Sequence, residues 1–388
     1  MSTLLVKETH MPPIYLDYNA TTPVDPLVVE KLLHYLHERF GNPSSSHEYG
    51  REAKDAVETA RAQLAALLGA EPSEIIFTSG GTEANNQALI ATARANAERG
   101  RHIITTEIEH PAVLNPLLWL DEQGFSVTIL PTDTYGLIDP AAVERAITPH
   151  TTLISVMHAN NEVGTIQPLA EIGAIARKQG IAFHTDAAQS VGKIQTRVDE
   201  LQVDLLTVAG HKFYAPKGVG ALYVRKGTAI ESYLYGAGHE SGRRAGTENV
   251  PYIVALGAAA ELAQQRIAAG STGTVALRDR LQSRLQELID GVELNGHPTE
   301  RLPNTLNVSF SGVVGAELLE QIPEIAASTG AACHGGISKL SGTLAAMGLS
   351  RERNLGAVRF SIGQWTTRDE VDRVVELVAA GVRKFRAA

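Results

Sequence analysis

The sequence predicts an α/β protein of two domains: a large domain with a mostly parallel seven-stranded sheet, and a smaller α+β domain. Three observations lead to this prediction. From about residue 17 to 224, short apolar runs alternate with helical patterns, which is typical of a parallel sheet covered by helices. After about residue 265, strong amphipathic helix patterns and two separate strand patterns follow instead. The length of 388 residues also exceeds what one hydrophobic core usually serves.

Seven short apolar runs are the expected strands of the large domain. They cover residues 74–78, 102–105, 127–130, 152–157, 181–185, 205–208 and 220–224. Two helices are expected among them, at residues 82–99 and 112–123. Ligands of such sheets bind beyond the carboxyl ends of the strands. We therefore expect the polar segments that follow the strands to meet at one edge of the sheet; they include SGGT, EIEH, HANN, HTDAAQ and AGHK.

The smaller domain is expected to combine two helices with two strands. The helices are predicted at residues 276–288 and 368–385, and the strands at residues 305–310 and 359–362. We place the domain boundary near residue 265, although no proline- or glycine-rich hinge marks it. The large domain then spans residues 15–265, and the small domain combines residues 1–14 with residues 266–388.

Charge and composition exclude several classes of protein. There are 34 lysines and arginines against 43 aspartates and glutamates, so the formal net charge is −9, and neither stable nucleic-acid binding nor membrane binding is expected. A single cysteine excludes an internal disulfide and a thiolate-rich zinc site. None of the 13 histidines forms an H-E-x-x-H motif, so no metal site is expected. Without a signal peptide or a long apolar run, we expect a soluble, cytoplasmic protein.

Two charged residues follow expected strands. Lys212 lies in AGHKFYAPKG, and it is either a surface lysine or an amine that burial keeps near neutral for Schiff-base chemistry. Asp186 ends another expected strand, where it either caps a following helix or pairs with a cation. The pyridinium nitrogen of pyridoxal phosphate is such a cation, and a carboxylate keeps that ring protonated.

A glycine-containing turn supplies a third feature. Residues 79–82 read SGGT and precede an expected helix, whose free N–H groups could bind a phosphate. Alone, this segment is equally an ordinary strand–helix turn. Together with the aspartate and the lysine, it predicts a pyridoxal phosphate site.

The chain resembles the cysteine desulfurases of the NifS/IscS type, which are class V aminotransferases among the fold-type I pyridoxal phosphate enzymes. The similarity runs from YLDYNATTP at Tyr15 to RFSIGQWTT at Arg359. Its other motifs are FGNPSSSH, FTSGGTEANN, EHPAV, NNEVGTIQP, HTDAAQSVGK, GHKFYAPKGVG and RRAGTENV. The resemblance implies removal of sulfur from L-cysteine, giving L-alanine and an enzyme-bound persulfide.

The resemblance also implies roles for residues around the cofactor ring. Lys212 would hold the cofactor as a Schiff base and move the substrate's α-proton. Asp186 would pair with the ring nitrogen, and His110 would stack on the ring and act as an acid or base. Gln189 and Asn160 would hydrogen-bond the phenolic oxygen or its surroundings.

The phosphate is expected to have ligands from two subunits. Gly81, Thr82 and His211 would hold it from one side, and Thr247 would reach it from the second subunit, so the resemblance implies a homodimer. Ala209 and Gly210 precede the histidine–lysine pair where the family carries a hydroxyl, so one phosphate donor is missing here.

The substrate is expected to meet three further residues. Arg359, with Asn42 nearby, would bind its carboxylate, since a guanidinium binds carboxylates through two parallel hydrogen bonds. Cys333 lies in STGAACHGG. A lone cysteine is generally a small buried residue, but the flanking small residues predict an exposed segment. The resemblance makes Cys333 the nucleophile that takes the substrate's sulfur. His334 beside it is atypical of the family.

Two alternatives stay open at this point. The chain could be a related pyridoxal phosphate lyase or aminotransferase in which Cys333 is incidental. It could also be a sulfur-carrying or regulatory subunit, although the presence of Lys212, Asp186 and His110 together argues against a degraded site. The sulfur acceptor is expected to be a protein that serves iron–sulfur clusters, thio-cofactors or tRNA, with DNA phosphorothioation as the alternative pathway.

Overall fold

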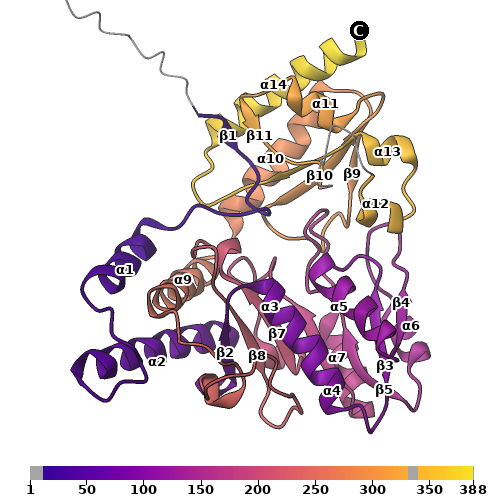
Figure 1. The fold of residues 1–388 in the computed structure, drawn as a ribbon. Coiled ribbons are helices and arrows are strands. Elements are labelled where there is room, and N and C mark those ends of the chain that lie inside the picture. The colour runs from indigo at the N-terminus through magenta and orange to yellow at the C-terminus, as the bar shows by residue number, and fades with distance from the viewer. Residues whose placement is uncertain (1–11, 331–339, 388) are drawn as a thin grey trace, which may run out of the picture.

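The computed structural model describes residues 12–330 and 340–387, and Figure 1 shows that they form two layered units. The large unit, in the lower half of the figure, is built on one sheet with the strand order β2–β8–β7–β6–β5–β3–β4. Its strands are β2 (Ile75–Thr78), β3 (His102–Thr106), β4 (Ser126–Leu130), β5 (Thr151–Ser155), β6 (Ala182–Asp186), β7 (Leu205–Ala209) and β8 (Gly220–Val224). Only β8 runs antiparallel to its neighbours in this sheet. The predicted mostly parallel seven-stranded sheet is confirmed.

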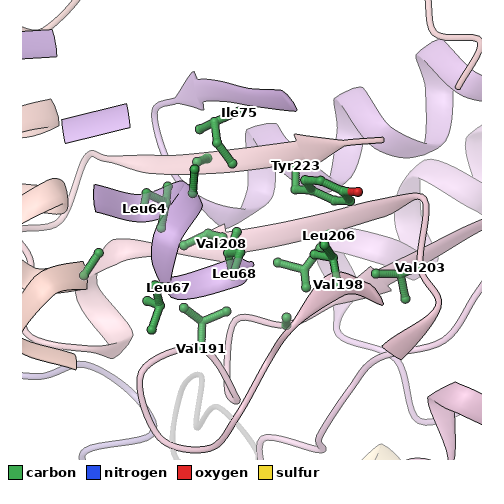
Figure 2. Close-up of a cluster of buried hydrophobic side chains, with 14 of the residues drawn as sticks. Leu64, Leu67, Leu68, Ile75, Val191, Val198, Val203, Leu206, Val208 and Tyr223 are labelled. Atoms are coloured by element: carbon green, nitrogen blue, oxygen red, sulfur yellow. The ribbon is translucent and has the colours of Figure 1, made fainter. Parts of the chain in front are cut away.

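Helices cover both faces of this sheet because both faces of its strands are apolar. One face carries α2 (Glu48–Leu68), α6 (Pro140–Ala146), α7 (Leu169–Gln179) and α9 (Val250–Ala269), and the other carries α3 (Gly81–Asn86), the π-helical turn η2 (Gln87–Ala91), α4 (Thr92–Ala95) and α5 (Pro111–Glu122). α1 (Pro26–His37) packs on α9. Figure 2 shows part of this core, in which Leu64 of α2 belongs to the same buried cluster as Leu206 and Val208 of β7.

The helix expected over residues 82–99 is shorter than predicted and is not uniformly α-helical. It begins at Gly81, passes through the π-helical turn and ends at Ala95. Asn96 ends it, because its backbone leaves the helical conformation and its side-chain nitrogen donates to the carbonyl oxygen of Thr92 at 2.8 Å. Asparagine competes with the backbone in this way, and the sequence pattern alone did not reveal it.

The small unit contains a three-stranded antiparallel sheet with the order β12–β10–β9. Its elements are β9 (Val292–Asn295), β10 (Thr305–Phe310), β12 (Ala357–Ser361), α10 (Thr272–Leu288), α11 (Gly315–Glu320), α12 (Gly342–Ala346), α13 (Arg351–Leu355) and α14 (Arg368–Ala387). β1 (Ile14–Tyr15) pairs in parallel with β11 (Ile325–Ala326), so the N-terminal segment joins this unit (Figure 1). Helix α9 continues unbroken past residue 265, and Gly270 follows it.

None of the helices within residues 12–330 and 340–387 is both long enough and apolar enough to cross a membrane.

Candidate active site

A cavity of about 410 Å³ lies beyond the carboxyl ends of β3, β5, β6 and β7. Its volume is within the roughly 300–1,000 Å³ that is usual for small-molecule and cofactor sites. The predicted site residues that line it are Gly81, Thr82, His110, Asp186, Gln189, His211, Lys212 and Arg359. The expectation that polar segments from distant strands meet at one edge is confirmed for seven of these residues, whereas Arg359 comes from β12 of the small unit.

Asp186 is the buried last residue of β6. One carboxylate oxygen accepts from the side-chain nitrogen of Asn85 at 2.7 Å, and the other accepts from the backbone N–H of Ala188 at 2.9 Å. The residues after Asp186 form turns, so the alternative of a helix cap is not observed. No cationic side chain of the described residues forms an ion pair with Asp186, and each of its oxygens accepts a single hydrogen bond. A cationic ring nitrogen in the cavity would supply the positively charged partner that this buried carboxylate lacks.

Lys212 ends a short 3₁₀ turn that follows β7. Its Nζ donates to the backbone oxygens of Asn19 at 2.7 Å and Ala20 at 2.8 Å. Burial and, to a lesser extent, the charge of Arg359 lower the pKa of Lys212 to about 8, although Asp186 and Asp17 oppose this. A substantial fraction of the amine is therefore neutral near pH 7–8 and able to attack a carbonyl carbon.

His110 caps the N-terminus of α5. Its Nδ1 accepts from the backbone N–H of Ala112 at 3.1 Å, so the neutral ring carries its proton on Nε2. Desolvation lowers the pKa of His110, and the charge of Lys212 lowers it further, although Asp186 acts in the opposite direction. The cavity thus contains a neutral imidazole with an Nε2–H donor.

The opposite end of the cavity fits an anion. Gly81 and Thr82 line it at the start of the helical run, where the first backbone N–H groups have no partner within the helix. A Cβ at position 81 would lie 3.1 Å from the Cβ of Ala209, so a glycine lets the start of the helix pack closely against the end of β7. Nδ1 of His211 lies 3.1 Å from the hydroxyl of Thr21. Burial lowers the pKa of His211 to about 4, so a neutral ring faces this end.

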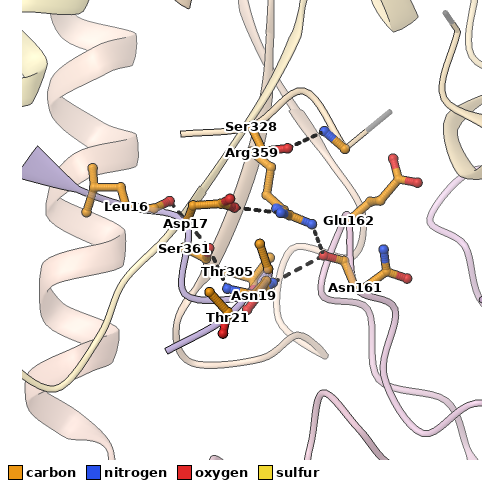
Figure 3. A network of polar contacts seen from close by, with 12 residues as sticks. Leu16, Asp17, Asn19, Thr21, Asn161, Glu162, Thr305, Ser328, Arg359 and Ser361 are labelled. Atoms are coloured by element: carbon orange, nitrogen blue, oxygen red, sulfur yellow. Dashed lines mark hydrogen bonds and ion pairs between the residues drawn. The ribbon is translucent and has the colours of Figure 1, made fainter. Parts of the chain in front are cut away.

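Arg359 brings the small unit to the cavity (Figure 3). Its Nη2 donates to a carboxylate oxygen of Asp17 at 2.7 Å, and its Nη1 donates to the backbone oxygen of Asn161 at 2.9 Å. Its Nε is buried without a hydrogen-bond partner among the described residues. A guanidinium with one carboxylate partner and an unused donor can hold a substrate carboxylate.

Two residues predicted for the site lie elsewhere. Asn160 is fully buried behind the cavity, where its Oδ1 accepts from the N–H groups of Glu162 and Val163 at 2.8 and 3.0 Å. Its neighbour Asn161 lines the cavity, and the role of Asn160 around the ring oxygen stays a prediction. Asn42 is exposed outside the cavity, and its Oδ1 accepts from the N–H of Ser44 at 2.9 Å as part of a turn.

Of two further predicted site residues, the structure describes Thr247 but not Cys333. Thr247 is exposed and does not line the cavity of its own chain. Cys333, with His334 beside it, lies outside the described residues. Gly330, three residues before Cys333, lines the cavity.

The prediction from single residues missed three polar side chains of the site. Asn85 holds Asp186, Asp17 holds Arg359, and Asn19 lies between Lys212 and the small unit. The EANN and YLDYNATTP motifs contain all three. These three residues could have been found by taking every Asp and Asn of the quoted motifs as a candidate site residue.

The donor set as a whole fits pyridoxal phosphate. A buried carboxylate faces a position for the ring nitrogen, an amine of lowered pKa faces the aldehyde position, and a helix N-terminus faces the phosphate position. The helix start at Gly81 and the unfilled acceptor capacity of Asp186 are features that this cofactor would use.

Comparison with known proteins gives the same assignment. The class-V aminotransferase family model matches residues 14–374. The cysteine desulfurase IscS of Methanosarcina thermophila is 49% identical over 375 residues, which is 96% of this chain and 93% of that protein. A cysteine desulfurase of a Nostoc species is 48% identical over 96% of this chain and 94% of its own length.

Solved structures agree. A NifS-like protein superimposes with a TM-score of 0.90 at 38% identity, covering 96% of this chain and all of that one. A structure described as SspA in complex with cysteine has a TM-score of 0.81 at 38% identity and covers 91% of this chain and 99% of that one. DndA from Streptomyces lividans has a TM-score of 0.76 at 38% identity, with 90% and 99% covered.

Proposed function

Since this chain belongs to the class-V aminotransferases and is a pyridoxal phosphate-dependent cysteine desulfurase, we propose that it moves sulfur from L-cysteine to Cys333 and releases L-alanine. One observation carries the assignment of residues. The cavity brings together Lys212, Asp186 and Arg359, which are the amine, the carboxylate and the guanidinium that this reaction needs. They come from two strand ends of the large sheet and one strand of the small one.

The cofactor would be held at three points. Asp186 would face its ring nitrogen, Gly81 and Thr82 would bind its phosphate together with His211, and Gln189 would donate to its ring oxygen. When bound, pyridoxal phosphate supplies an electron sink for carbanion character on the substrate. Ala209 contributes no hydroxyl, so the backbone N–H groups at the helix start have a larger share of phosphate binding.

The substrate carboxylate would bind Arg359. This guanidinium is fixed by Asp17 and by the backbone oxygen of Asn161, so its orientation is set before the substrate arrives. A preorganised cation loses little freedom when it binds a carboxylate. The α-carbon of the substrate is thereby held near Lys212.

Proton transfers would fall to two neutral bases. Lys212, with a pKa of about 8, can take the proton from the substrate's α-carbon. His110 can donate its Nε2 proton or accept one at the same nitrogen. Both groups line the cavity in which the substrate would bind.

Sulfur transfer would use Cys333 as its thiolate. An S–S bond forms between Cys333 and the substrate sulfur while the substrate's C–S bond breaks. The electron pair of that bond stays with the carbon, which takes a proton and becomes the methyl group of alanine. The resulting persulfide then passes to an acceptor protein. We expect that protein to serve iron–sulfur clusters, thio-cofactors or tRNA, with DNA phosphorothioation as the alternative.

We propose that the enzyme acts as a cytoplasmic homodimer in which Thr247 reaches the phosphate of the partner subunit. A second hollow of about 790 Å³ supports this, because it shares Thr82 and His110 with the cofactor cavity and is bordered by Trp119 and Leu234. Its apolar rim and its position beside the phosphate end fit a loop of a second copy. Analytical ultracentrifugation of the holoenzyme would test the dimer.

A single-turnover experiment tests the sulfur transfer. Wild-type holoenzyme and the Cys333→Ser variant receive L-cysteine, and both alanine and the mass of the peptide around residue 333 are measured. We expect alanine and a 32-dalton sulfur adduct from the wild type only, this mass being about that of one sulfur atom. Equal product from both proteins would show that Cys333 is incidental and that the chain is another pyridoxal phosphate lyase.

A further inference from the structure

Lys193 is the cation in this region that the mechanism does not use. Lys193 lines a hollow of about 320 Å³ to which Lys212 also contributes, and its amine is buried. The enclosed amine has a pKa well below its usual range, because burial disfavours its charge and Lys212 and Arg359 add positive charge nearby. Burying an amine costs free energy, so a lysine at this position is expected to have a specific role.

The hydrogen bonds of Lys193 are directed at the cofactor cavity. Its Nζ donates to Oε1 of Gln189 at 2.8 Å and to Oδ1 of Asn19 at 3.0 Å. Both partners are amide oxygens, which can only accept, so Lys193 is the donor in both bonds whether its amine is charged or neutral. A neutral amine has two N–H groups, and these two bonds would use both.

This contact fixes which way the Gln189 amide faces. With Oε1 turned to Lys193, Nε2 donates one N–H to the backbone oxygen of Asn19 at 2.9 Å. The same amide nitrogen has a second N–H, and Gln189 lines the cofactor cavity. The reversed amide would direct an oxygen at the backbone oxygen of Asn19, which loses that bond and creates a repulsion, and it would also lose the bond from Lys193 whenever that amine is protonated.

Asn19 completes a rigid frame around this amide. Its Oδ1 also accepts from Nδ2 of Asn304 at 3.0 Å, and its own Nδ2 donates to the hydroxyl of Thr305 at 2.8 Å. Its backbone oxygen accepts from Lys212 as well as from Gln189. Lys193, Gln189 and Asn19 thus form a closed set of three hydrogen bonds beside the amine that would hold the cofactor.

The backbone places Lys193 there through a tight turn. Gly192 before it has φ +80°, and a side chain at that position would meet the Cβ of Phe213 at 2.5 Å. The N–H of Lys193 donates to the carbonyl oxygen of Ser190 at 3.0 Å. The turn returns position 193 to the side of Gln189, four residues earlier.

We propose that Lys193 is a positioning residue that holds Gln189 as a hydrogen-bond donor to the ring oxygen of the cofactor. This inference rests on the proposed function, since it requires the cofactor ring beside Gln189. A donor at the ring oxygen stabilises its anionic form and so favours loss of the neighbouring Schiff-base proton. Lys193 therefore acts on the cofactor only through Gln189.

The test is a pH titration of the visible absorbance of the bound cofactor, which needs no turnover. The charged and titratable groups around the expected cofactor position are Lys212, Arg359, Asp17, Asp186, His110 and His211, and the variants leave all of them unchanged. In Lys193→Met, where Gln189 is no longer held, we expect the midpoint of this absorbance titration to rise by about 1 pH unit relative to the wild type. Lys178→Met removes an exposed lysine of α7 and should leave the midpoint unchanged.

Further variants separate positioning from charge. Lys193→Gln keeps an N–H donor without the charge, and its midpoint should stay near that of the wild type. Gln189→Leu should raise the midpoint as Lys193→Met does, and the double variant should rise no further. A wild-type midpoint in Lys193→Met, or an equal rise in Lys193→Gln, would overturn the positioning role.

The outcomes also distinguish this inference from the proposed function. If Gln189→Leu shifts the midpoint and Lys193→Met does not, only the role of Lys193 is wrong. If neither variant shifts it, the proposed position of the cofactor ring is wrong as well. Should Lys193→Met fail to fold by circular dichroism, Lys193→Gln decides: a midpoint as high as that of Gln189→Leu overturns the inference, and a wild-type midpoint supports it.

Discussion

The cofactor cavity has two halves that the chain builds in different ways. The sheet-edge half consists of His110, Asp186 and Lys212, and the cross-unit half consists of Asp17, Asn19 and Arg359. Each residue of the first half lies at a strand end or within four residues of one. In the second half, the partners Asp17 and Arg359 are 342 residues apart in the chain.

The two halves also differ in how far the hydrogen-bonding groups of their side chains already have partners. Asp186 retains acceptor capacity and His110 retains an Nε2–H donor, so the sheet-edge half depends on what enters the cavity. Arg359 is already bound to a carboxylate and to a backbone oxygen. This difference indicates that the sheet edge supplies the chemistry and the cross-unit half supplies preset geometry for the substrate.

The largest effect is expected from Lys212→Ala in the sheet-edge half. Loss of the amine removes both the covalent link to the cofactor and the base for the α-proton, so kcat/KM should fall by roughly 10⁴-fold or more. Absorbance spectra and alanine release would measure it. Lys178→Ala is the matched control on an exposed helix. An unchanged visible spectrum would contradict the role of Lys212.

A smaller effect is expected from Arg359→Lys in the cross-unit half. The charge stays, but the two-pronged hydrogen bonding is lost, which costs about 1.5–3 kcal/mol and raises KM for L-cysteine roughly 10- to 100-fold. The kcat should change much less, because binding rather than chemistry is weakened. Arg280→Lys, which alters a surface pair with Asp372, is the control. An unaltered KM would place the carboxylate elsewhere.

Adjacent asparagines allow a sharper comparison of structural and functional roles. Asn160→Ala leaves the buried N–H groups of Glu162 and Val163 without their acceptor, so the free energy of unfolding should fall by about 1–3 kcal/mol. Asn161→Ala removes a side chain of the cavity wall and should alter KM while leaving that free energy nearly unchanged. Urea denaturation with steady-state kinetics measures both. A reversed pattern would show that Asn160, rather than Asn161, acts in the site.

The sequence predicted the sheet-edge half better because a simple rule governs it. Parallel strands direct their carboxyl ends to one edge, so Asp186 and Lys212 could be placed together without knowing any long-range contact. For the two consecutive asparagines at 160 and 161, spacing along the chain does not say which one faces the cavity, and in the structure Asn161 lines it.

The cross-unit half could not be predicted from strand patterns. Arg359 was identified by resemblance alone, and its contact with Asp17 depends on β1 pairing with the small unit. A strand of two residues carries too weak a pattern to predict that pairing. Lys193 was likewise hidden, because its role depends on the direction of one amide rather than on a motif.

The smallest predicted effect is that of Arg359 and Asp17, in the cross-unit half, on the pKa of Lys212 in the sheet-edge half. Burial and the charge of Arg359 lower the pKa of Lys212 to about 8, while Asp186 and Asp17 act in the opposite direction. Only the neutral amine attacks an aldehyde, so the rate of cofactor uptake by the apoprotein should rise with pH through about 8 and then level off. Stopped-flow absorbance with added pyridoxal phosphate measures this midpoint.

Variants of the two partners should move that midpoint in opposite directions. Arg359→Met removes a positive charge that disfavours protonated Lys212, so the pKa of Lys212 and the midpoint should rise. Asp17→Asn removes a negative charge that favours the protonated form, so both should fall. Loosening of the cavity by either substitution would move the two midpoints the same way. Shifts of equal sign would therefore show that the two halves are coupled through packing and not through charge.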